Sequence, residues 1–119
     1  MSSFSISRRI RSFGYAFAGV RVLLSTQHNA RFHAVATLAV CVAAGIFRVS
    51  ALEWGLLTVA VGQVWVAEAL NTALELLADE VSEEKRSRIG KAKDAAAFGV
   101  LAAALSSLII GCIVFLPHL

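Results

Sequence analysis

Three apolar runs dominate the pattern of hydrophobic and polar positions along the chain. They cover residues 31–47, 54–78 and 95–116. Each is close to the roughly 20 residues that a helix needs to cross the hydrocarbon core of a membrane. Arg31, His33 and Arg48 flank the rather short first run, and their polar ends can reach the interfaces. The third run begins with small residues that permit close helix packing. The pattern predicts three transmembrane helices.

The segment before these runs, residues 4–24, has a different periodicity. Its apolar side chains recur at steps of three and four, at Ile6, Ile10, Phe13, Phe17, Val20 and Leu24. Arg8, Arg11 and Arg21 lie off this stripe. A helix with one apolar stripe and a basic polar side suits the membrane interface. We therefore expect an N-terminal amphipathic surface helix, and packing of its stripe against a partner helix is a compatible explanation.

Composition agrees with a membrane protein. Hydrophobic residues make up 58% of the chain and charged residues 16%, far from the usual balance of soluble domains. A very apolar soluble helical bundle is the alternative. The length of 119 residues suits one domain, residues 1–119. Cys41 and Cys112 lie inside apolar runs and are expected to be small buried hydrophobes. The predicted class is an all-α membrane protein.

The distribution of charge predicts an orientation. The formal net charge is +3, and every one of the eleven Lys and Arg residues except Arg48 lies in or near the N-terminal helix or in the hydrophilic segment 79–93. The positive-inside rule then places the N-terminus and that segment in the cytoplasm. The basic N-terminal third indicates contact with an anionic membrane surface rather than with nucleic acid. No cleavable signal peptide is visible, and a transit peptide is the less favoured reading.

The second apolar run carries a polar stripe. Glu68, Asn71, Glu75 and Asp79 follow one another at spacings of three, four and four, so they share one helix face. Ionisable residues in a membrane segment are costly and suggest function. Glu68, deeper in the membrane, suits a general base acting on a hydroxyl, and Asn71 could orient it or bind a polar headgroup. Glu75, near the interface, could hold Mg²⁺ through its carboxylate oxygens.

A second group of polar residues, Gly90 to Asp94, precedes the third run. Basic side chains at the start of a helix can bind phosphate, and Asp94 could cap that helix or contact a nucleotide. An interfacial anchor is the simpler explanation of these residues taken alone. Together with the carboxylates of the second run they suit phosphoryl transfer. The chain has no Walker motif, kinase catalytic loop or glycine-rich nucleotide loop, so the kinase would be an unconventional one.

These motifs resemble those of the small bacterial integral-membrane diacylglycerol kinases, a family that also includes undecaprenol kinases. The resemblance rests on residues 68–75 (EALNTALE), Asp79, the hydrophilic segment after it and residues 92–96 (AKDAA). Gly14-Tyr15 and residues 29–33 (NARFH) are also similar. The likeness covers essentially the whole chain.

The resemblance implies a fold, a reaction and a set of site residues. The fold is a homotrimer in the bacterial inner membrane, with active sites shared between subunits. The reaction uses ATP and Mg²⁺ to phosphorylate the hydroxyl of diacylglycerol or undecaprenol, giving phosphatidic acid or undecaprenyl phosphate. Glu68 matches the catalytic base, Glu75 and Gln27 the metal ligands, and Arg8, Glu68 and Asn71 the substrate contacts. Nucleotide contacts are implied for Arg8, Tyr15, Gln27, Glu75, Glu84, Lys85, Arg86, Lys93 and Asp94.

Two positions depart from the best-known diacylglycerol kinase. Gln27 replaces a second metal-binding glutamate, and an amide oxygen can ligate Mg²⁺ without supplying charge. Ala97 replaces a serine near the acceptor hydroxyl. This change and the Asn29-x-Arg31-x-His33 pattern look more like the undecaprenol kinases. Two other hypotheses stay open: a small subunit that uses intramembrane carboxylates to translocate protons or ions, and a scaffold whose polar stripe joins helices.

Overall fold

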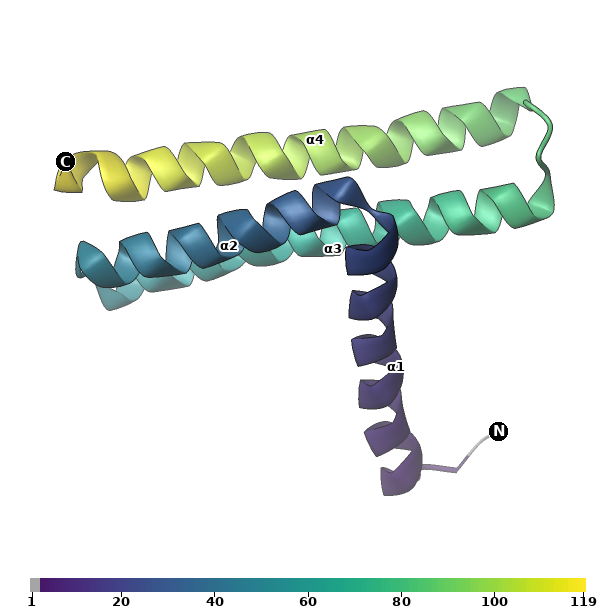
Figure 1. Ribbon diagram of the computed structural model, residues 1–119, viewed down its shortest axis with the longest axis horizontal. Coiled ribbons are helices and arrows are strands. Elements are labelled where there is room, and N and C mark those ends of the chain that lie inside the picture. Colours follow the sequence, from purple (N-terminus) through teal and green to yellow (C-terminus); the bar gives the residue numbers. More distant parts are fainter. Residues whose placement is uncertain (1–2) are drawn as a thin grey trace.

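The computed structural model describes residues 3–119, and its helices form a three-helix bundle with a fourth helix set across it (Figure 1). The helices are α1 (Ile6–Thr26), α2 (His28–Ile46), α3 (Ala51–Val81) and α4 (Ser87–Phe115), followed by a short 3₁₀ turn, η1 (Leu116–His118). α4 runs alongside α3 for most of its length, and α2 packs along the N-terminal half of α3. α1 projects sideways from the start of α2. The predicted all-α architecture is confirmed.

Three of the helices in residues 3–119, α2, α3 and α4, are long and apolar enough to cross a membrane. The 19 residues of α2 make about 28 Å of helix at 1.5 Å per residue, which matches a hydrocarbon core of about 30 Å. The 31 residues of α3 and 29 residues of α4 extend well beyond α2, and they do so toward the loop that joins α3 and α4 (Figure 1). Glu75, Asp79 and Lys93 lie in this projecting part.

The hydrophilic segment expected between the second and third spans is mostly helical. α3 continues to Val81 and α4 begins at Ser87, so only residues 82–86 connect them. Arg86 is the N-cap of α4, and the predicted role of Asp94 as a helix cap is therefore wrong. Most residues of the segment 79–93 are Glu, Lys, Arg or Ala, which favour helix. A helix can therefore continue through them beyond the membrane surface. The N-terminal helix likewise starts at Ile6 and ends at Thr26 rather than covering 4–24.

The opposite end of the bundle is closed by a tight turn between α2 and α3. Arg48 takes a left-handed conformation, with φ 53°. The N–H of Val49 donates to the carbonyl of Ala44 at 3.2 Å, and that of Arg48 donates to Gly45 at 3.3 Å. These two bonds form a Schellman motif at the end of α2. Val49 is thereby turned into a small buried cluster with Ala44, Leu57 and Val114.

Most large apolar side chains point outward from the single chain. Phe32, Leu38 and Phe98 are 71%, 66% and 68% exposed. Cys41 and Cys112, expected to be buried, are also exposed. Three helices can bury only the narrow faces on which they meet, and lipid or a neighbouring protein then covers the rest. The exposed apolar surface agrees with a membrane protein.

Candidate active site

The polar stripe of α3 is buried at its deeper end. Glu68 is 1% exposed and Thr72, one turn further, is 3% exposed. Glu68 Oε2, Asn71 Oδ1 and Thr72 Oγ1 are buried and have no hydrogen-bond partner within the described part of the chain. An unsatisfied buried polar group costs about 1–3 kcal/mol, so three together indicate a site that accepts polar partners. Sequence reasoning missed Thr72, although its spacing of four from Glu68 places it on the same face.

A polar neighbour of Glu68 comes from another helix. His33 Nε2 on α2 lies 3.7 Å from Glu68 Oε2, and the side chain of His33 is 17% exposed. The His33 ring meets the ring of Trp65 edge-on, with centroids 6.5 Å apart. Trp65 Nε1 donates to Thr37 Oγ1 at 3.0 Å, which fixes α2 against α3 beside this contact. Sequence reasoning placed His33 at the interface and did not pair it with Glu68.

At the rim of the site, which is the end of the stripe near the α3–α4 connection, residues of the two sequence motifs contact each other. Lys93 Nζ on α4 donates to Asp79 Oδ1 on α3 at 2.8 Å. Lys93 lies before the apolar part of α4, and its hydrogen bond with Asp79 raises its pKa above the ordinary value. The negative charges of Asp79 and Glu75 act in the same direction. Lys93 therefore remains a cation at neutral pH, next to the acidic end of the stripe.

The junction of α1 and α2 holds another predicted residue. Gln27 is the single residue between the two helices, and its side-chain amide donates to Thr26 at 3.4 Å. Arg31 donates to the carbonyls of Leu24 at 2.7 Å and Ser25 at 2.9 Å. These bonds satisfy the free carbonyls at the end of α1 and set its direction. Sequence reasoning expected Arg31 only to reach the interface.

Several predicted site residues are not brought to the stripe within this chain. They are exposed and, within residues 3–119, make no hydrogen bond or ion pair with it: Arg8, Tyr15, Glu84, Lys85, Arg86 and Asp94. Gln27 also makes no such contact with Glu75. A ligand or a neighbouring subunit would have to join these residues to Glu68, and α1, which is set across the bundle, is free to meet either (Figure 1).

The donor set at the rim fits Mg²⁺ bound together with a nucleotide. No three His, Cys, Asp or Glu side chains among residues 3–119 come close enough to form a metal site by themselves. Mg²⁺ usually needs only one or two protein carboxylates, because phosphates and water complete its shell. Glu75 and Asp79, one turn apart, offer oxygen donors of this kind, although Asp79 is engaged by Lys93.

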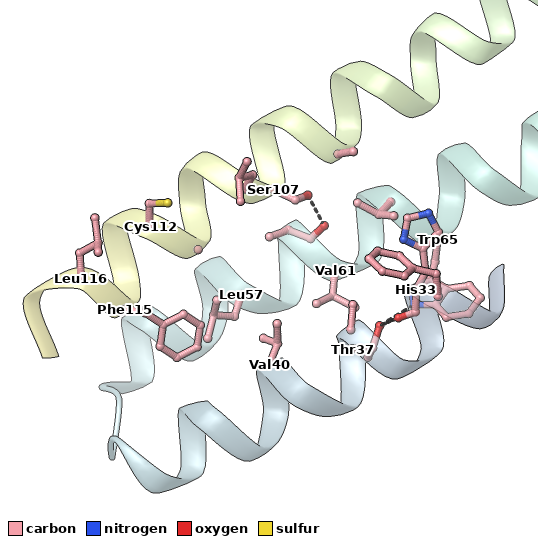
Figure 2. A pocket seen from close by; sticks show the side chains of 17 residues that line it. His33, Thr37, Val40, Leu57, Val61, Trp65, Ser107, Cys112, Phe115 and Leu116 are labelled. Carbon is pink, nitrogen blue, oxygen red and sulfur yellow. Dashed lines mark hydrogen bonds between the residues drawn. The ribbon is translucent and has the colours of Figure 1, made fainter. Parts of the chain in front are cut away.

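An apolar groove leads along the bundle away from this site (Figure 2). It has a volume of about 460 Å³ and is lined by residues of α2, α3 and α4. His33 and Trp65 lie at one end, and Phe115 and Leu116 lie at the other. Such a groove suits a long hydrocarbon chain lying across the membrane.

Comparison with known proteins identifies the family of this chain. The family model for prokaryotic diacylglycerol kinase matches residues 14–115. The chain is 35% identical to an undecaprenol kinase of Bacillus subtilis, over 96% of this chain and 93% of that protein. It is 32% identical to a diacylglycerol kinase of Escherichia coli, over 94% and 92%. A diacylglycerol kinase of Synechocystis is 38% identical over 91% of this chain, which spans 62% of that protein. The chain therefore belongs to the prokaryotic diacylglycerol kinase family.

Proposed function

We propose that this protein transfers the γ-phosphoryl group of ATP to the hydroxyl of a membrane lipid, with Mg²⁺ as cofactor. The observation that carries the proposal is the buried carboxylate of Glu68, whose Oε2 has no hydrogen-bond partner among the described residues, on the same helix face as the Asp79–Lys93 pair. Glu68, a base within the membrane, thus shares a helix face with Asp79, which holds the cation of Lys93 at the rim. Phosphoryl transfer to a lipid needs both, because the hydroxyl lies in the membrane and the phosphates lie in water.

Each group then has a role. Lys93 neutralises the charge of the phosphates, with Lys85, Arg86, Asp94, Arg8 and Tyr15 as further nucleotide contacts. Glu75 and Gln27 hold the metal, which when bound stabilises the negative charge that develops on the phosphates. Glu68 is the base for the hydroxyl proton, and Asn71 orients the headgroup beside it. Positioning and charge neutralisation supply most of the catalysis in such reactions.

The proposed enzyme is a homotrimer in the bacterial inner membrane, with its active-site rim in the cytoplasm. The large apolar side chains that a single chain leaves exposed are consistent with self-association, because lipid or a neighbouring subunit must cover them. The exposed positions of Arg8 and Glu84 are consistent with sites shared between subunits. The positive charge of α1 and of the α3–α4 connection supports the orientation.

The test is a lipid kinase assay with two acceptors. The protein is purified in detergent and mixed with labelled ATP, Mg²⁺ and either diacylglycerol or undecaprenol. We expect labelled phosphatidic acid or undecaprenyl phosphate, and no label in the lipid when Mg²⁺ is chelated. The acceptor that is labelled identifies the substrate. No labelled lipid with either acceptor, in protein that remains helical and soluble, contradicts the proposal. Acidification of vesicles containing the protein would instead support proton translocation.

A further inference from the structure

The base proposed for the lipid hydroxyl does not face the groove in which a lipid chain fits. The apolar groove is lined by residues of α2, α3 and α4, and Glu68 is not one of them. Glu68 is 1% exposed, so little of its carboxylate is open to any ligand. His33, by contrast, lines the groove at the end nearest Trp65 (Figure 2). A hydroxyl at the end of a chain in this groove would meet His33 before Glu68.

His33 also contacts Glu68 directly. Its Nε2 lies 3.7 Å from Glu68 Oε2, which is within ion-pair distance but longer than a hydrogen bond. Contacts of this kind are often long without substrate and shorten when it binds. Glu68 Oε2 has no other partner in the described chain, and His33 Nδ1 makes no hydrogen bond among residues 3–119. One ring nitrogen thus faces the carboxylate, and the other is free to accept a proton.

The surroundings of the ring leave Glu68 as its charged partner. Phe32 on α2 and Trp65 on α3 place their rings against it. The guanidinium of Arg31, two residues earlier, is held by the carbonyls of Leu24 and Ser25. The α4 wall of the groove has no charged side chain, and its titratable member, Cys112, lies toward the other end.

We propose that His33 is a catalytic residue that removes the proton from the lipid hydroxyl, and that Glu68 acts through it. The inference rests on the proposed lipid kinase function and changes one role in it: His33 accepts the hydroxyl proton directly, and Glu68 positions the His33 ring and stabilises its charged form. As the lipid oxygen bonds to the γ-phosphorus, the bond from that phosphorus to the β–γ bridging oxygen of ATP breaks, and ADP leaves. The hydroxyl proton passes to Nδ1 of His33, while the Nε2–H faces Glu68 Oε2. The imidazolium later releases its proton to water.

The chemistry of the two side chains favours His33 as the proton acceptor and Glu68 as its supporting carboxylate. An imidazole titrates at about pH 6.5 in water, so it can accept and release a proton near neutral pH. A buried carboxylate beside a histidine orients the ring and stabilises its charged form, without itself having to touch the substrate. This role also explains why the Glu68 carboxylate is buried although its Oε2 accepts no hydrogen bond.

The first test compares two histidine variants. His33→Gln removes the titrating ring and keeps a polar side chain of similar reach. His118→Gln is the matched control, because His118 Nε2 also contacts a glutamate, Glu53, at 3.1 Å at the far end of the bundle. We expect His33→Gln to lower kcat by about 100- to 10 000-fold, with little change in the KM for ATP. His118→Gln should keep the kcat of the unmodified protein. A kcat for His33→Gln within about threefold of normal overturns the proposal.

The second test separates catalysis from a structural role. At saturating Mg-ATP and lipid, kcat of the unmodified protein should fall as the pH is lowered, and this acid limb of the profile should follow the protonation of one group. The residual activity of His33→Gln should lack this limb, and His118→Gln should retain it. The same limb in His33→Gln overturns the proposal. A flat profile in the unmodified protein also overturns it, and that profile can be measured even where His33→Gln fails to fold. Failure of the unmodified protein to phosphorylate either lipid would instead reject the proposed function.

Discussion

Glu68 is a predicted site residue to which the structure adds both burial and a neighbour. Its position among apolar residues predicted a functional carboxylate, and the structure shows it 1% exposed with an unpaired oxygen. Burying a carboxylate is costly unless a partner compensates for it. The partner that the structure supplies is His33, which the sequence pattern placed only at the edge of the first span. The place of this carboxylate on the polar stripe was thus predictable, and its neighbour was not.

Replacing Glu68 tests its role in the reaction. Glu68→Gln keeps the size and polarity of the side chain but removes its charge. We expect kcat to fall by at least about 100-fold, with the oligomer intact by size-exclusion chromatography. Glu80→Gln is the matched control, since Glu80 is exposed on the same helix. A fully active Glu68→Gln protein would remove Glu68 from the mechanism.

Gln27 tests the second metal ligand. The residue lies at the junction of α1 and α2 and offers a neutral oxygen. Gln27→Glu adds a negative charge, which should strengthen Mg²⁺ binding. We predict that the Mg²⁺ concentration giving half-maximal activity falls. Asn29→Asp adds the same charge two residues away, at an exposed position, and should leave it unchanged. An unchanged or higher half-saturation point for Gln27→Glu contradicts the prediction.

At the scale of single helices, apolar runs predicted the three long apolar helices but not the residues at which they end. α3 and α4 continue through charged residues to Val81 and back to Ser87. The start of α3, in contrast, has a specific local signal. Ser50 Oγ accepts from the N–H of Glu53 at 3.1 Å, and Glu53 Oε1 accepts from the N–H of Ser50 at 3.0 Å. The Ser-x-x-Glu spacing of this capping box marks the start of α3 independently of the apolar pattern.

The capping box predicts a measurable loss of stability. Ser50→Ala removes the side-chain acceptor and leaves the Glu53 N–H at the start of α3 without it. We expect the free energy of unfolding in detergent to fall by about 1 kcal/mol. Ser12→Ala is the control, because the hydroxyl of Ser12 only donates to the carbonyl of Arg8 within α1. Equal losses in the two variants would show that the box adds nothing specific.

At the scale of the whole molecule, polar contacts join the helices at several levels along the bundle. Asp79–Lys93 joins α3 to α4 at the rim, and Trp65–Thr37 joins α2 to α3. Gln63 on α3 donates to the hydroxyls of Ser106 and Ser107 on α4, both at 2.9 Å. Apolar side chains gain little by leaving lipid for one another, so packing and such bonds hold membrane helices together. The contacts keep α2 and α4 on either side of the groove.

The contact between Gln63 and the two serines offers a test of this view. Gln63→Leu removes both bonds and keeps a side chain that packs in lipid. We predict a loss of about 1 kcal/mol in unfolding free energy, from about 0.6 kcal/mol per interhelical bond. Thr58→Val is the control, since the hydroxyl of Thr58 donates only to the carbonyl of Trp54 in its own helix. Denaturation with a strong detergent can measure both. A Gln63→Leu protein as stable as normal would contradict the prediction.

The sequence by itself determined the class, the spans and the polar face of α3. Residues on one helix have relative positions set by the helical repeat, so Glu68, Asn71, Glu75 and Asp79 could be grouped without a structure. Only the tertiary structure decided that His33 faces Glu68 and that Lys93 reaches Asp79. These distances depend on how far each helix slides and turns against its neighbour. Many side chains together settle that packing, and no local pattern reports it.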